Sequence, residues 1–151
     1  MNTGTPIDII TPEMTLAAIA EVVQEVGSGY VYVNHNGQSP VWDDDIDTCV
    51  REVTCLYVHG TVRDEDGGLN YSNATPGCIV GKALYRLGFS LESMHKGNAL
   101  MAASLLEKDG FEAVSSGGAK ILRVAQQAQD TGHTYGFALE RARLTMLKLT
   151  N

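Results

Sequence analysis

Apolar residues recur every three or four positions in two long stretches, near the beginning of the chain and at its end. In the first stretch, Thr11 can cap a helix that begins at Pro12, apolar side chains recur as far as Val26, and Gly27 can end the helix. An N-cap residue, an early proline and a terminal glycine together are typical of a complete helix. The pattern therefore predicts a helix over residues 12–26.

The C-terminal third is the most helical part of the sequence. Ser115 or Ser116 can begin one helix that ends at Gly132, and Thr134 can cap a last helix. The last helix has two apolar faces, which are Tyr135, Leu139, Ala142, Met146 and Leu149 on one side and Phe137, Leu144 and Leu147 on the other. A chain of 151 residues has little material to cover both faces. We therefore expect a homo-oligomer that buries the second face.

The middle of the chain has the pattern of short strands, turns and short helices. Residues 30–33 and 55–62 are rich in β-branched and aromatic side chains and predict strands. The segment 64–68 has the composition of a hairpin turn that returns through 69–71. Short helices are expected over residues 78–87, 91–95 and 99–106, and a loop with a short helix over 38–53.

These elements predict an α+β fold, in which a small antiparallel sheet packs with several short helices and the C-terminal third is helical. The length is that of a single domain over residues 1–151, with residues 1–10 expected to be flexible. Sixteen glycines favour short elements over a bundle of long helices.

The charge and composition exclude several functions. Eighteen acidic against eleven basic residues give a formal net charge of −7, and no basic stripe offsets it, so we expect no direct binding to nucleic acid. The sequence predicts neither a secretion signal nor a membrane span, and three cysteines fit a reducing compartment. We therefore expect a cytoplasmic protein that does not contact membranes.

Several segments resemble one family in the same order along the chain. They are Cys55-Leu56-Tyr57-Val58, Pro76-Gly77-Cys78-Ile79-Val80-Gly81-Lys82-Ala83-Leu84, and residues 124–132 with 136–139. Together they resemble a family of small uncharacterised proteins of actinobacteria and their phages, with the motifs C-x-Y-V, P-x-C-I-V-G-x-x-L-x-x-L-G and A-Q-x-x-Q-D-x-G. The resemblance covers residues 55–145, with Tyr135 where tryptophan is more usual. It implies a phage or prophage accessory protein in a bacterial host cell and assigns no catalytic residue.

Within this motif, Gly81 lies one turn into its helix, where a neighbouring strand can approach closely. We expect that strand to be the one beginning at Cys55. Cys55 and Cys78 would then pack together as small buried side chains. The glutamines Gln126, Gln127 and Gln129 are interpreted as the polar face of their helix.

The glycine-rich start of the helix near residue 115 is the strongest candidate for a ligand site. Free backbone N–H groups, hydroxyls and a lysine at a helix start favour an anion. The predicted ligand-binding residues are Ser115, Ser116, Gly117, Gly118 and Lys120, with the aromatic side chains Tyr30 and Tyr57. The expected function is the binding of a small anionic or nucleotide ligand, for example to sequester a signal of host defence, with no cofactor.

Three alternatives remain open from the sequence. The protein could be an adaptor that binds and modulates a host protein, or an enzyme that uses Cys78 with His59. A zinc site formed by Cys55, His59 and Cys78 is a weaker alternative, because the chain has no C-x2-C pair. The acidic run at residues 43–47 does not match a calcium loop, since it lacks the required glycine and the terminal carboxylate.

Overall fold

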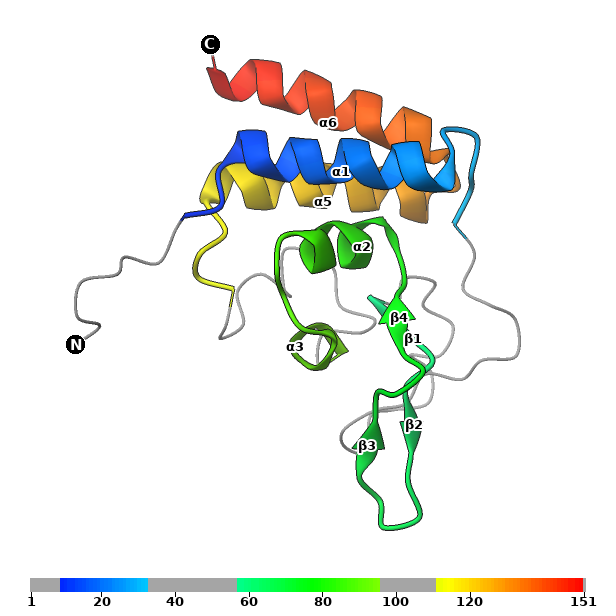
Figure 1. Cartoon of the computed structure of the whole chain (residues 1–151). Helices are drawn as coiled ribbons and strands as arrows, with labels where there is room; N and C mark the ends of the chain where they lie inside the picture. The colour runs from blue at the N-terminus through cyan, green and yellow to red at the C-terminus, as the bar shows by residue number, and fades with distance from the viewer. Residues whose placement is uncertain (1–8, 33–56, 96–110, 151) are drawn as a thin grey trace, which may run out of the picture.

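The computed structural model describes residues 9–32, 57–95 and 111–150. Three helices lie side by side: α1 (Pro12–Val26), α5 (Ser116–Asp130) and α6 (Tyr135–Thr150) (Figure 1). The shorter helix α2 (Ile79–Arg86) packs against α1 and α5, and α3 (Leu91–His95) follows it. The predicted helices over 12–26, 78–87, 91–95 and the C-terminal third are confirmed to within two residues or so.

The strands form two separate antiparallel ladders. β1 (Val58–His59) pairs with β4 (Thr75–Pro76), and β2 (Val62–Arg63) pairs with β3 (Leu69–Asn70). Figure 1 shows that the β2–β3 hairpin projects away from the helices. The α+β class with a helical C-terminal region is confirmed, but the sheet consists of two two-stranded pieces.

The strand predicted over 55–62 is interrupted, and Gly60 explains the interruption. Its φ of +83° lies in the left-handed region that favours glycine. A Cβ at this position would also lie 2.7 Å from the carbonyl oxygen of Asn73. The chain therefore turns at Gly60, and the residues on either side belong to different ladders.

The ends of the long helices are fixed by the predicted capping residues. Thr11 Oγ1 accepts a hydrogen bond from the Met14 amide at 3.1 Å, and Ser115 Oγ accepts one from the Gly118 amide at 3.0 Å. Thr134 Oγ1 accepts one from the Phe137 amide at 3.1 Å. Each bond satisfies an amide that has no partner within its own helix, which is why these positions begin helices.

The hydrophobic core lies between α1, α2, α5 and α6. Fully buried side chains come from all four helices, and they include Ile19, Val22, Ile79, Leu84, Ile121, Leu122, Tyr135 and Ala142. The apolar stripe predicted on the last helix faces this core as far as Met146, which is half-buried against it, while Leu149 and the opposite set are exposed. None of the helices within the described ranges is long and apolar enough to cross a membrane.

Ile10 is held in place, although the sequence predicts a flexible segment over residues 1–10. Ile10 is buried, its amide donates to the Ala113 carbonyl at 2.7 Å, and its carbonyl accepts from the Ser115 amide at 3.0 Å. The expectation of a flexible segment over 1–10 is therefore wrong for Ile10, because its side chain and backbone are both held by the start of α5. Of the predicted strand 30–33, Val31 forms a single antiparallel bridge with Thr134. Residues 1–8 and the elements expected over 38–53 and 99–106 lie outside the described residues.

Candidate ligand-binding groove between two helices

The outer surface of α2 follows from its helical pattern. Ile79, Val80, Ala83 and Leu84 are buried in the core, so Lys82, Tyr85 and Arg86 are carried on the other side of the helix. Residues three and four positions apart are neighbours on a helix surface. The two cationic side chains and the aromatic ring therefore form one polar face on α2.

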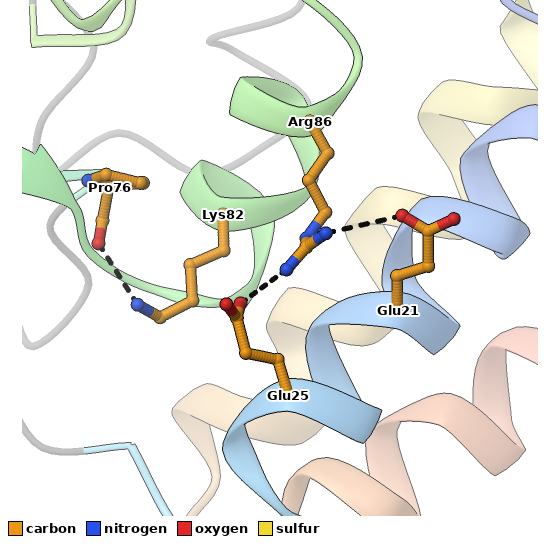
Figure 2. A network of polar contacts seen from close by, with 5 residues as sticks. All are labelled: Glu21, Glu25, Pro76, Lys82 and Arg86. Atoms are coloured by element: carbon orange, nitrogen blue, oxygen red, sulfur yellow. Dashed lines mark hydrogen bonds and ion pairs between the residues drawn. The ribbon is translucent and has the colours of Figure 1, made fainter.

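A complementary acidic face lies on α1. Glu21 and Glu25 are one turn apart, and Arg86 reaches both of them. Arg86 Nη1 lies 3.3 Å from Glu21 Oε1, and Nη2 contacts Glu25 Oε1 (Figure 2). The planar guanidinium can bind two carboxylates at once because its donors diverge in a fixed plane. These exposed pairs contribute little to stability, but they fix the position of Arg86.

Lys82, unlike Arg86, forms no ion pair with a described residue. Its Nζ donates to the Pro76 carbonyl at 3.2 Å, and no carboxylate among the described residues lies within ion-pair distance of it. In Figure 2 the side chain extends from α2 toward Pro76, away from the Arg86–Glu21 contact. Its positive charge is therefore not neutralised by a described side chain.

These residues surround a groove with a volume of about 500 Å³, lined by Glu25, Val26, Thr75, Pro76, Lys82, Tyr85 and Arg86. This volume lies within the range of small-molecule sites in proteins. Tyr85 is 49% exposed, so its ring is available to a ligand. The groove thus combines one cation without a described carboxylate partner, one open aromatic ring and the apolar surfaces of Val26 and Pro76.

No protein-family model matches the chain, and comparison with curated proteins and with solved structures also finds no match.

The helix start predicted to bind an anion is closely packed against α1. Ser115 Oγ is engaged in capping the Gly118 amide. A Cβ on Gly117 would lie 2.7 Å from Cγ of Pro12, and one on Gly118 would lie 2.7 Å from Oγ1 of Thr15. The two glycines are thus explained by the close approach of α1 and α5, while Ser116 and Lys120 are exposed beside them. For this reason we do not place the ligand at this helix start.

The two aromatic residues assigned to that site do not converge on it. Tyr30 is half-buried and packs edge-to-face on Tyr135, with ring centroids 5.0 Å apart, beyond the C-terminal end of α5. Ser115 lies at the other end of this helix, whose 15 residues span about 22 Å. Tyr57 is completely buried, and its hydroxyl donates to Gln126 Oε1 at 3.1 Å. Its ring is not accessible to a ligand in this structure.

The interpretation of the glutamines as a polar face is wrong for Gln126 and Gln129, each only 3% exposed. Gln129 Oε1 accepts from the Ile79 amide at 2.8 Å and from the Tyr135 hydroxyl at 3.2 Å. Buried amide side chains are stable when their polar atoms find partners. Here the partners come from α2 and α6, and only Gln127 of the three is exposed.

The hydrogen bond from the Ile79 amide to Gln129 caps the start of α2. Cys78, the N-cap of α2, makes no side-chain hydrogen bond to the first amides of that helix. Gln129 therefore performs on α2 the function that a serine or threonine N-cap would perform locally. The groove face of α2 is thus held in place from α5.

The residues proposed for a cysteine–histidine enzyme or a zinc site show other contacts. Cys78 is fully buried at the start of α2, and His59 Nε2 lies 2.8 Å from the Tyr32 hydroxyl. Among the described residues, no group of three or more histidine, cysteine, aspartate or glutamate side chains is placed to hold a metal ion. Cys55, the third residue of the zinc alternative, lies outside the described residues.

The C-terminal end of α5 contains a carboxyl group with a shifted pKa. Burial raises the pKa of Asp130 above 3.8, and hydrogen bonds from Gln129 and Gln126 partly oppose this shift. The residue as a whole is exposed, so the energetic effect is small. Because the folded state binds this proton more tightly, the contribution of Asp130 to stability is fully present below pH 3.8 and is lost as the pH rises through the raised pKa.

Asp130→Asn should remove this loss of stability. Asparagine does not titrate and still offers an oxygen to Gln129 Nε2, which contacts Asp130 Oδ1 at 3.0 Å. We expect the variant to gain stability relative to the wild type as the pH rises from about 3.5 to about 7, by less than about 1 kcal/mol. Urea unfolding of both proteins over this pH series measures the difference. A difference that shrinks with rising pH would contradict the assignment.

Proposed function

We propose that this protein is a phage or prophage accessory protein that acts by binding, and that the groove between α1 and α2 holds a small organic anion with a planar ring, such as a nucleotide. The observation that supports this most directly is the Lys82 ammonium, which borders a groove of about 500 Å³ and has no described carboxylate partner. The phage context rests on the family resemblance over residues 55–145.

The anionic group of the ligand is expected to bind Lys82. An ammonium bound to a single backbone carbonyl has remaining donors for a carboxylate or phosphate oxygen. A charge-assisted hydrogen bond of this kind is about twice as strong as a neutral one. Arg86 is not expected to be the primary anion site, because the carboxylates of Glu21 and Glu25 already pair with its charge.

The ring of the ligand is expected to pack on Tyr85. Tyr85 lies three positions after Lys82 and on the same side of α2, so an anion on the lysine places the rest of the ligand over the tyrosine. Stacking of a base on an aromatic side chain contributes roughly 1–3 kcal/mol and does not depend on the identity of the base. The groove therefore favours a planar ligand and does not by itself select one base.

The charges of the groove limit the ligand further. The groove is lined by two cations, Lys82 and Arg86, and one carboxylate, Glu25, and Glu21 beside it also pairs with Arg86, so the charges in and next to the groove give little attraction to a polyanion from a distance. A ligand with one anionic group and hydrogen-bond donors that reach Glu25 fits this balance better than a triphosphate. We accordingly expect mononucleotides to bind more tightly than triphosphates.

Lys82→Met tests the anion site. Methionine keeps much of the length and the apolar character of the side chain and removes the charge. With nucleoside monophosphates as probes, we expect calorimetric titration to show affinity at least about tenfold weaker for the variant, the equivalent of losing one charge-assisted bond. Tyr85→Ala should also weaken binding, by loss of stacking.

Lys120→Met is the matched control, since Lys120 is an exposed lysine on α5 at the helix start where no ligand is proposed. It should bind the probes as the wild type does. Equal loss in the Lys120 variant would move the site back to the start of α5. Native mass spectrometry of protein from a bacterial lysate provides a second measurement, because a retained mass of nucleotide size identifies the natural ligand directly. Failure of every monophosphate to bind, with no retained mass, would refute the groove as an anion site.

The adaptor alternative has one observation in its favour, the exposed apolar side chains on the outer face of α6. A sequestering protein and an adaptor differ in what they retain from a lysate, a small molecule in the first case and a host protein in the second.

A further inference from the structure

Glu25 brings a hydrogen-bond acceptor into the groove between α1 and α2. Its side chain lines the groove and is 66% exposed, and its Oε1 accepts a hydrogen bond from Nη2 of Arg86. No donor among the described residues binds its second oxygen, Oε2. An ionised carboxylate only accepts hydrogen bonds and has about four lone-pair sites, so most of its capacity is open to a ligand.

Glu21, the other partner of Arg86, has a different position. It lies one turn earlier on α1 and pairs with Nη1 of Arg86 at 3.3 Å, but it does not line the groove. In Figure 2 the carboxylate of Glu25 lies between the side chains of Lys82 and Arg86, and the carboxylate of Glu21 lies on the far side of Arg86. Of these two acids, Glu25 is therefore the one that a molecule in the groove can contact.

We infer that Glu25 binds the sugar hydroxyls of the ligand and makes the groove prefer ribonucleotides to deoxyribonucleotides, an inference that rests on the proposed binding of a nucleotide at Lys82 and Tyr85. In a nucleoside monophosphate the sugar connects the phosphate to the base. With the phosphate on Lys82 and the base on Tyr85, the sugar lies in the middle of the groove, which Glu25 lines from α1. The 2′ and 3′ hydroxyls are neighbouring donors, so both can donate to one carboxylate.

The charge of Glu25 also fixes the direction in which the ligand lies. A carboxylate repels a phosphate and accepts a strong, charge-assisted hydrogen bond from a hydroxyl, whereas the Lys82 ammonium attracts the phosphate. A ligand bound in the reverse direction would lose both interactions. Arg86 already holds the Glu25 carboxylate in the groove before the ligand arrives, which lowers the cost of ordering this side chain on binding.

Calorimetric titration with adenosine monophosphate and 2′-deoxyadenosine monophosphate tests the inference, because the two probes differ by one hydroxyl. The wild type should bind the ribonucleotide at least about fivefold more tightly, a modest factor because the carboxylate is exposed. Glu25→Met should reduce the ratio of the two affinities to less than about twofold. Methionine is a good helix former of similar length, and it removes the acceptor.

Glu21→Met is the matched control. Glu21 is 61% exposed, and its loss also takes one carboxylate away from Arg86. Both variants free part of the Arg86 charge and thereby change the affinity for the two phosphates alike, so the measured quantity is the ratio of the two affinities. Glu21→Met should keep the ratio of the wild type. Circular dichroism of both variants should be unchanged, since both positions are exposed.

Three results would overturn the inference. Equal affinity of the wild type for both probes would do so, and the proposed function would still stand if Lys82→Met weakened the binding of both. A preference for the ribonucleotide that survives in Glu25→Met, or that is lost equally in Glu21→Met, would show that Glu25 does not contact the sugar. If neither probe bound to the wild type, the proposed function would fail, and this inference would fail with it.

Discussion

Gly81→Ala should destabilise the protein by about 3 kcal/mol or more, although alanine is the better helix former by about 1 kcal/mol. Gly81 lies in α2 directly against β1, and a Cβ at this position would overlap the backbone carbonyl of Tyr57. That carbonyl also accepts a hydrogen bond from the Gly77 amide at 2.8 Å, so it cannot move without breaking the entry into the helix. Urea unfolding followed by circular dichroism measures the loss.

The matched control is Gly29→Ala. No atom lies within 4 Å of a Cβ at Gly29, and its φ is outside the left-handed region, so alanine is accommodated there. We expect no loss of stability for this variant, and a gain of up to about 1 kcal/mol because alanine restricts the unfolded chain. A Gly81→Ala protein as stable as the control would show that α2 can move away from β1.

Gln129→Leu should cost about 2–4 kcal/mol, because it leaves two buried donors without their acceptor. The donors are the Ile79 amide at 2.8 Å and the Tyr135 hydroxyl at 3.2 Å. Leucine has a similar volume and fills the space, so the loss arises from hydrogen bonding and not from a cavity. The free energy of unfolding in urea provides the measurement.

Two further variants test how much of this loss of stability comes from the buried position of Gln129 and how much from the Tyr135 donor. Gln127→Leu changes an exposed glutamine of the same helix and should alter stability by no more than about 0.5 kcal/mol. Tyr135→Phe removes one of the two donors and should reduce the penalty of Gln129→Leu when the two changes are combined. If Gln129→Leu and Gln127→Leu were equally stable, Gln129 would have no role in capping α2.

The helices could be predicted because their signals are local. Thr11, Ser115 and Thr134 act on amides three residues ahead, so the boundaries of α1, α5 and α6 are determined by neighbouring residues. The close approach at Gly81 was also predictable, because a glycine inside an otherwise good helix indicates a neighbour that leaves no room for a side chain. The expected strand beginning at Cys55 does supply that neighbour, through Tyr57.

The buried glutamines and the groove could not be predicted in the same way. Gln126 finds its partner 69 residues away in Tyr57, and Gln129 finds one 50 residues away in Ile79. A glutamine on a helix has the same local pattern whether it faces water or a buried donor. Likewise, the two acidic residues at 21 and 25 on α1 have the spacing of an ordinary solvent-exposed helix face. The two basic residues at 82 and 86 on α2 have it as well. The groove arises only when the core residues of both helices bring those faces together.

The cap that α5 supplies to α2 makes the proposed binding groove a late product of folding. An isolated helix of eight residues is not stable in water, and α2 has no side-chain cap of its own. During synthesis α2 leaves the ribosome after α1 but before α5, so the start of α2 lacks its cap until the C-terminal third has been made. A fragment that ends before Gln129 would contain all seven residues that line the groove, but it would lack the acceptor that caps the start of α2.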